Sequence, residues 1–119
     1  MAVLIELRAE VVPDHDPDPS YLEQDGFEQR RAAYERGDFG YVGVRAVAVV
    51  RYERNHELRH AEQTLRSAGI WGIEDDGEAL YLDEIYAEEL RALRAVIEEL
   101  GVRYNPQQFE LAEQTGVAT

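Results

Sequence analysis

Two segments of the chain alternate apolar and polar residues with the period of two that is typical of β-strands. In residues 2–12, this alternation predicts a half-buried strand whose inward row is Val3, Ile5, Leu7, Ala9 and Val11. In residues 40–54, the inward row is Val42, Val44, Ala46, Ala48, Val50 and Tyr52. Because Val47 and Val49 are apolar on the opposite side, the second strand is expected at a central position that is covered on both faces.

Two other segments have the composition and caps of helices. The first runs over 21–36, with Ser20 as the expected N-cap and Gly37 as the C-cap, although its apolar stripe is thin. The second runs over 84–100 between Asp83 and Gly101, and it has apolar residues at steps of three and four. This long amphipathic helix is expected to pack on a sheet or on a neighbouring helix.

The segment between the central strand and the last helix permits two interpretations. It contains His56-Glu57-Leu58-Arg59-His60, which has the HExxH spelling of zinc proteases. On a helix, His56 and His60 would share one face and could bind one zinc ion, with Glu57 as the base. On the return strand of a hairpin, over about 58–67, the two histidines would lie about 13 Å apart and could not share a metal. Periodicity alone slightly favours the helix.

The composition narrows the classes of partner. Twenty-five acidic residues against 12 basic ones give a net charge of −13, which repels nucleic acid and anionic membranes and favours basic partners. Cysteine is absent, which excludes disulfides and thiolate zinc sites and favours a reducing cytoplasm. We find no signal peptide, no apolar run of membrane-spanning length, and no glycine-rich phosphate loop or nucleophile elbow.

The acidic residues cluster in the second half of the chain. Between Arg66 and Arg91 there is no basic residue, and the cluster comprises Glu74, Asp75, Asp76, Glu78, Asp83, Glu84, Glu88 and Glu89. The dipole of the last helix accounts for acids at its first turn but not for those before it. We therefore expect these eight carboxylates to form a partner-binding surface, with a solvated turn and helix start as the alternative. Trp71, just before the cluster, is expected in the core, with an exposed partner anchor as the alternative.

Two stretches resemble a family of small, uncharacterised acidic proteins of bacteriophages, plasmids and actinobacterial genomes. They are YLEQDGFEQRRAAYERGDFGYVGVRA (21–46) and LRSAGIWGIEDDGEALYLDEIYAEELRALRAVIEELGV (65–102), of which the run GIWGIEDDGE is the more specific part. The resemblance implies a return strand ahead of the tryptophan, which favours the hairpin over the zinc helix. It implies a mobile-element context, but it implies no particular chemistry, because members of this family have no established activity.

The pattern and the resemblance together predict one α+β domain over 1–104. The expected order is β-α-β-β-α, with an antiparallel sheet and a long C-terminal helix packed on it. Residues 105–119 are polar and are expected to form a loosely ordered tail.

The expected function is that of a non-enzymatic interaction protein of phage or mobile-element type, located in the host cytoplasm. It would bind and block a basic protein, such as a CRISPR effector or another nucleic-acid-binding host protein, as a nucleic-acid-mimicking, anti-CRISPR-like inhibitor. It would use no cofactor and contact neither nucleic acid nor membrane, and a homodimer is left open. The alternatives are a small zinc metallohydrolase that uses His56, Glu57 and His60, and a housekeeping structural module.

Overall fold

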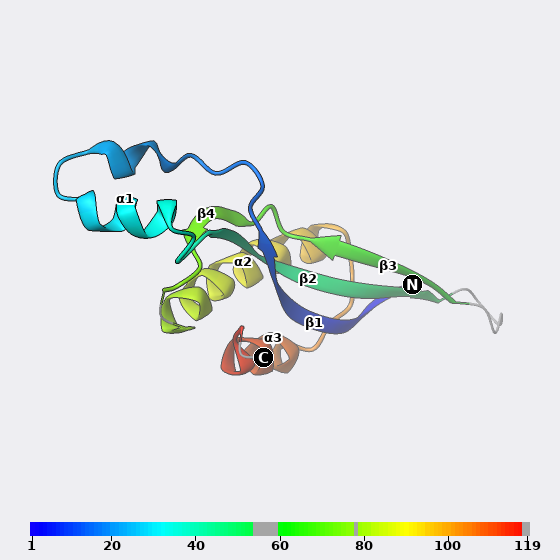
Figure 1. Ribbon diagram of the computed structural model, residues 1–119. Helices are drawn as coiled ribbons and strands as arrows, with labels where there is room; N and C mark the ends of the chain where they lie inside the picture. The colour runs from blue at the N-terminus through cyan, green and yellow to red at the C-terminus, as the bar shows by residue number, and fades with distance from the viewer. Residues whose placement is uncertain (54–59, 78, 118–119) are drawn as a thin grey trace.

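The fold is an α+β arrangement built on one antiparallel sheet. The computed structural model describes residues 1–53, 60–77 and 79–117. In this part of the chain, four strands pair: β1 (Ala2–Pro13), β2 (Tyr41–Glu53), β3 (His60–Arg66) and β4 (Ile70–Glu74). Strand β2 is central, with β1 along one edge and with β3 and β4 at the two ends of the other edge (Figure 1). The predicted antiparallel α+β fold and central strand are confirmed, and β4 is an additional strand.

A β-bulge changes which residues of β1 point inward. The pairing of β1 with β2 shifts between Leu4 and Glu6. As a result Leu4 is buried, while Ile5 is 37% exposed. Ala2 and Leu4, rather than the expected Val3 and Ile5, therefore share the core face with the inward residues after the bulge. Simple alternation misassigns the first half of the strand because one extra residue reverses the direction of every side chain before it.

The helix expected over 21–36 is divided in two. A short 3₁₀-helix, η1 (Pro19–Glu23), is followed by α1 (Glu28–Glu35). Between them Gly26 has a φ of 95°, a left-handed conformation that ends regular helix and that glycine adopts without steric cost. The N-cap of η1 is Asp18, whose carboxylate accepts a hydrogen bond from the main-chain N–H of Ser20 at 3.1 Å.

Two helices follow the sheet where one helix and a loose tail were expected. Helix α2 (Ala79–Glu99) begins before the expected start, so Asp83 lies inside it and is not its N-cap. Helix α3 (Pro106–Thr115) occupies most of the expected tail. Asn105 and Gln108 form a reciprocal capping box at its start, and Pro106 occupies the first turn. The expected loose tail is thus wrong over 106–115, because these residues have both a helix cap and an apolar face.

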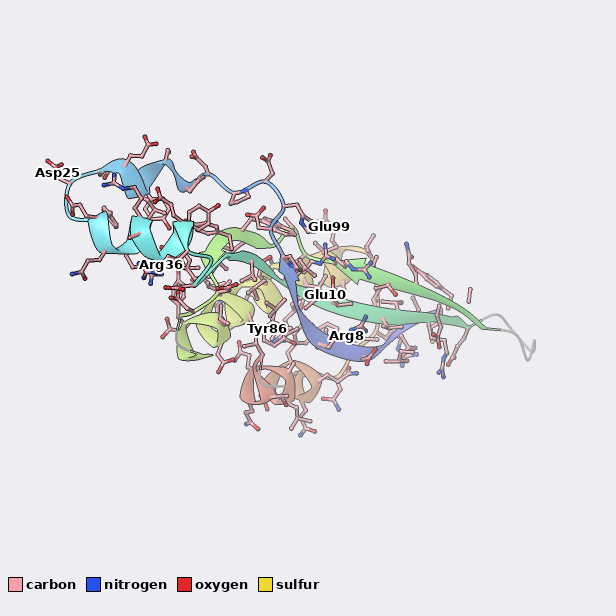
Figure 2. The ribbon with its side chains drawn as sticks, viewed as in Figure 1. Arg8, Glu10, Asp25, Arg36, Tyr86 and Glu99 are labelled. Carbon is pink, nitrogen blue, oxygen red and sulfur yellow. The ribbon has the colours of Figure 1, made fainter. Side chains whose placement is uncertain are left out.

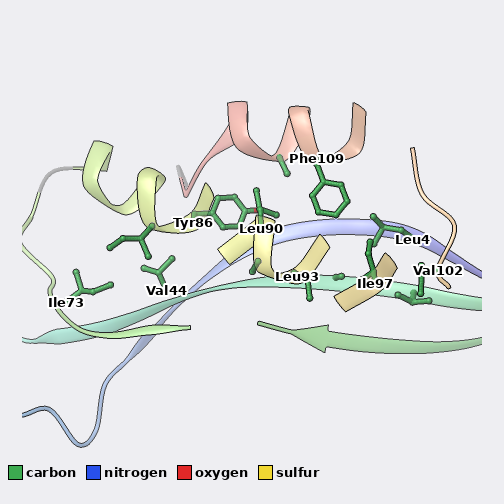
Figure 3. Packing of buried hydrophobic residues seen from close by; sticks show 14 residues of the cluster. Leu4, Val44, Ile73, Tyr86, Leu90, Leu93, Ile97, Val102 and Phe109 are labelled. Atoms are coloured by element: carbon green, nitrogen blue, oxygen red, sulfur yellow. The ribbon is translucent and has the colours of Figure 1, made fainter. Parts of the chain in front are cut away.

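The main core lies between the sheet and the two C-terminal helices (Figure 3). Helix α2 packs across β2, and α3 contacts both α2 and β1. The buried residues of this core are Leu4, Val44, Ala46, Ala48, Val50, Ile73, Ile85, Tyr86, Leu90, Leu93, Ile97, Val102, Phe109 and Ala112. A second, smaller cluster of Leu22, Phe39 and Tyr41 holds η1 and α1 against the end of β2.

The molecule is elongated. Its principal extents are 63 × 25 × 24 Å and its radius of gyration is 18.0 Å, whereas a compact domain of this length would have a radius of gyration of about 13–14 Å. The segment with η1 and α1 extends from one end of the sheet, and β2 and β3 extend toward the other end (Figure 1). This shape separates two ends that differ in charge.

Candidate functional site

The whole net charge belongs to two segments of the chain that meet at the start of β2. Residues 14–40 and 74–89 contain sixteen acidic residues and three arginines, a net charge of −13, whereas the rest of the chain contains nine acidic and nine basic residues. The two segments lie together, because Asp75 donates its main-chain N–H to the carbonyl of Gly40 at 3.0 Å and accepts the N–H of Gly40 at 2.9 Å. We call residues 14–40 and 74–89 the acidic end.

Arg30 joins the two segments of the acidic end. Its guanidinium donates to Glu74 at 2.6 Å and to both carboxylate oxygens of Asp76 at 2.9 and 3.0 Å. The same group lies 3.9 Å from the ring centroid of Phe39, a cation–π contact. The hydrogen bonds from Arg30 hold the pKa of Asp76 below its usual value. Arg30 thereby offsets part of the charge of two residues that were expected to face a partner.

Three further carboxylates of the predicted surface bond to main-chain N–H groups. Asp75 binds Gly40, as above, and Asp83 accepts the N–H of Val117 at 2.8 Å, which ties α2 to the end of α3. Glu89 is buried and accepts from the hydroxyl of Ser67 at 2.9 Å and from the N–H of Gly69 at 2.5 Å. These contacts stabilise turns and helix ends, so the three residues hold the fold together.

The exposed carboxylates include part of the predicted set and extend beyond it. Of the predicted residues, four are exposed: Asp75, Asp76, Glu84 and Glu88, of which the last two lie one turn apart on α2. Glu78 lies outside the described residues. The first segment of the acidic end adds seven exposed carboxylates that the sequence prediction missed. Three of them accept hydrogen bonds within the segment, namely Asp18, Glu28 and Asp38, and the other four are Asp16, Glu23, Asp25 and Glu35. Asp25 lies at the outer tip of this segment (Figure 2). The following six exposed side chains form no ion pair with another described residue: Asp16, Glu23, Asp25, Glu35, Glu84 and Glu88.

A hollow lined with aromatic residues borders the acidic end at β4. It has a volume of about 400 Å³, and its lining includes Tyr21, Ile70, Trp71, Glu74, Gly77 and Tyr81. Trp71 is 45% exposed, so its expected place in the core is wrong. The ring lies against Gly43, where an added Cβ would come within 2.2 Å of it, and the indole N–H donates to the carbonyl of Ala68 at 3.0 Å. Close approach to the sheet therefore fixes the ring outside the core.

The phenol of Tyr21 connects this hollow to the sheet. It forms a hydrogen bond of 2.8 Å with the phenol of Tyr41 and donates another to Glu74. Burial, followed by the hydrogen bond to Glu74, raises the pKa of Tyr21 far above its usual value, so the phenol stays neutral. Glu74 is thereby held in place by both Tyr21 and Arg30.

The HExxH segment lies only in part within the described residues. Residues 60–66 form β3, in which His60 pairs with Glu53, so the predicted return strand is confirmed there and the zinc helix does not form over these residues. His56 and Glu57 lie outside the described residues. Within 1–53, 60–77 and 79–117, no group of three histidine, aspartate or glutamate side chains is arranged to hold a metal ion. Within the same ranges, no helix has the length and apolar character needed to cross a membrane.

The contact between Arg30 and Asp76 predicts a pH dependence. Because the pKa of Asp76 is lowered in the folded state, its contribution to stability is present above about pH 4 and is lost as the pH falls through the folded value. We expect the melting temperature to fall more steeply between about pH 5 and pH 2 in the wild type than in Arg30→Met. Arg31→Met is the matched control and should keep the wild-type profile. Calorimetry across this range checks the prediction, and parallel profiles for the wild type and Arg30→Met would contradict it.

Comparison with known proteins adds no further constraint. Neither family models nor curated proteins nor solved structures give a significant match to this chain. The charge distribution and the exposed side chains are therefore the features that bear on function, and the resemblance to phage and plasmid proteins stays a prediction.

Proposed function

We propose that the protein is a non-enzymatic interaction protein whose acidic end docks on a basic, nucleic-acid-binding surface of a host protein. The observation that supports this proposal is the confinement of the whole net charge of −13 to residues 14–40 and 74–89. A surface of one sign attracts a surface of the opposite sign, speeds association and repels nucleic acid. The acidic end would occupy the site on the partner that otherwise binds phosphates.

The charge sets the size of the surface that can be blocked. Duplex DNA carries one charge per ~1.7 Å of its axis, so a net charge of −13 matches about 22 Å of duplex. This length is shorter than one helical turn of about 34 Å. The acidic end therefore suits a partner groove that covers less than one turn, and blocking such a groove would suffice to exclude the nucleic acid.

The proposal extends to the biological setting. The resemblance of 21–46 and 65–102 to phage and plasmid proteins supports a mobile-element origin. In that setting the partner would be a CRISPR effector or another nucleic-acid enzyme of the host, and the protein would act as its inhibitor. The exposed Asp16, Glu23, Asp25, Glu35, Glu84 and Glu88 would face the partner. Residues such as Asp75 and Glu89, which bind main-chain N–H groups, would act only through the fold.

A charge-neutralised variant tests the proposal. The triple variant Asp25→Asn, Glu84→Gln, Glu88→Gln removes three exposed charges from the acidic end, and the control Glu53→Gln, Glu99→Gln, Glu110→Gln removes three exposed charges elsewhere. We expect the wild type and the control to capture a basic protein from a lysate of the encoding organism at about 50 mM salt and to lose it at about 500 mM. The triple variant should bind about tenfold more weakly.

Sheared duplex DNA added to the lysate should compete with the capture, since both ligands would occupy one surface. Capture that is insensitive to salt, or an equal loss of binding in the two triple variants, would contradict the proposal. Capture that DNA does not reduce would show that the partner's nucleic-acid site is not the surface involved.

A further inference from the structure

Three large apolar side chains are exposed around the hollow beside β4. Ile70 is 41% exposed, Trp71 45% and Tyr81 54%, and all three line the hollow of about 400 Å³. Exposed apolar side chains that gather around one concavity mark binding sites more often than scattered ones do. Tryptophan and tyrosine are also the residues that contribute most to binding at protein interfaces. The hollow thus has the composition of a binding site, and its chemistry indicates the ligand.

The lining combines aromatic faces with a carboxylate. Tyr21, Trp71 and Tyr81 contribute three aromatic rings, and Glu74 contributes its carboxylate. A cation over an aromatic face is attracted by the negative face of the π-system, and a carboxylate nearby adds a direct ion pair. Since the hollow borders the acidic end, the surrounding field also favours a cation. These features together select a cationic group that is flat and has an apolar stem.

Arg30 shows the same recognition chemistry within the chain. Its guanidinium stacks on Phe39 and forks between Glu74 and Asp76, next to the hollow. Guanidinium suits this combination better than an ammonium ion because it is planar and presents several donors in a fixed fork. The Glu74 side chain is 31% exposed, and a carboxylate has about four acceptor positions. The bonds from Arg30 and Tyr21 therefore leave acceptor capacity toward the hollow.

We propose that this hollow binds an arginine side chain of the basic partner. The guanidinium would stack on Tyr81 and donate to Glu74, while its aliphatic stem would lie against Ile70 and Trp71. The Trp71 ring itself already lies against Gly43 and under the guanidinium of Arg45, 6.0 Å from the ring centroid. The proposal rests on the proposed function, in which the partner's surface is basic. It adds a specific anchor to a contact that would otherwise depend on long-range charge alone.

The single tryptophan of the chain gives a direct test, because Trp71 lies in the hollow. The probe is a capped hexapeptide of alternating glycine and arginine, and the control peptide carries citrulline, a neutral isostere, in place of arginine. We expect a saturable change in tryptophan emission with the arginine peptide and none with the citrulline peptide. Tyr81→Ala should weaken the binding about tenfold. Leu100→Ala, which removes an exposed side chain just after the end of α2, should leave it unchanged.

A labelled peptide followed by fluorescence anisotropy separates this proposal from the proposed function. Binding by anisotropy with no change in tryptophan emission and no effect of Tyr81→Ala would overturn the arginine site and leave the acidic docking surface standing. Weaker peptide binding by Tyr81→Ala, together with normal capture of the basic protein by the charge-neutralised triple variant, would support the arginine site and overturn the docking surface. Absence of peptide binding at about 50 mM salt, or an equal response to a glycine–lysine peptide, would overturn the arginine site. Circular dichroism of Tyr81→Ala verifies that the fold is retained.

Discussion

Replacing Phe109 by alanine is expected to lower the free energy of unfolding by about 3–5 kcal/mol. Phe109 is only 5% exposed and belongs to the main core, although it comes from α3 near the end of the chain. Its ring centroid lies 5.3 Å from that of Tyr104 in an edge-on arrangement, and the guanidinium of Arg94 lies 5.2 Å from it. The substitution would leave a cavity between α3, α2 and β1. Chemical denaturation followed by circular dichroism measures the change.

The control for Phe109 lies in the same helix. Leu111 is 62% exposed, so Leu111→Ala should change the free energy of unfolding by less than about 0.5 kcal/mol. The two variants remove side chains of similar character and differ mainly in burial. If Phe109→Ala were as mild as Leu111→Ala, α3 would not be packed on the core, and the loosely ordered tail would be the better description.

Replacing Glu89 by alanine is expected to cost about 2–3 kcal/mol. Glu89 is 7% exposed and is the acceptor at one end of a chain of hydrogen bonds. In this chain, Ala46 of β2 donates its N–H to the hydroxyl of Ser67 at 2.8 Å, and that hydroxyl donates to Glu89. Alanine would leave the N–H of Gly69 and the hydroxyl of Ser67 without this acceptor. The expected cost is the desolvation of these donors, and denaturant unfolding with hydrogen exchange at Gly69 measures it.

Two further variants separate the hydrogen bonds of Glu89 from its charge. Glu89→Gln keeps a carbonyl oxygen as acceptor and should be milder than alanine, since only the assistance of the charge is lost. Glu88→Ala removes a neighbouring exposed carboxylate and should be close to neutral. If Glu88→Ala lowered the free energy of unfolding as much as Glu89→Ala, the structural role of Glu89 would be contradicted.

The sequence predicts the long regular elements well. Strands β1 and β2 are 12 and 13 residues long and α2 has 21, so each contains several periods of its apolar pattern. Strand β4 has only five residues, and it was missed because Gly69 and Gly72 in and beside it read as turn positions. Helix α3 was missed although the sequence contains its start signal, Asn105-Pro106 with Gln108 three residues after the cap. Short elements are stabilised mainly by tertiary contacts, which the apolar pattern of the sequence does not reveal.

The candidate site was predicted only in part, for a related reason. A run of carboxylates in the sequence predicts negative charge but not which N–H group or arginine each carboxylate will meet. Arg30 comes from a helix more than forty positions before Glu74 and Asp76, and Glu89 meets a main-chain N–H twenty positions before it. The exposed carboxylates at 16–35 were missed for the converse reason, because only the fold brings that segment beside 74–89.

The uneven charge along the long axis gives the molecule a large electric dipole moment. Near a basic surface, a body of 63 Å with its net charge at one end experiences a torque as well as an attraction. In the proposed docking, the molecule would therefore rotate before contact and meet the partner with the acidic end first. In the docking proposed above, β2 and β3 would point away from the partner's surface, into the space through which a competing ligand would approach (Figure 1).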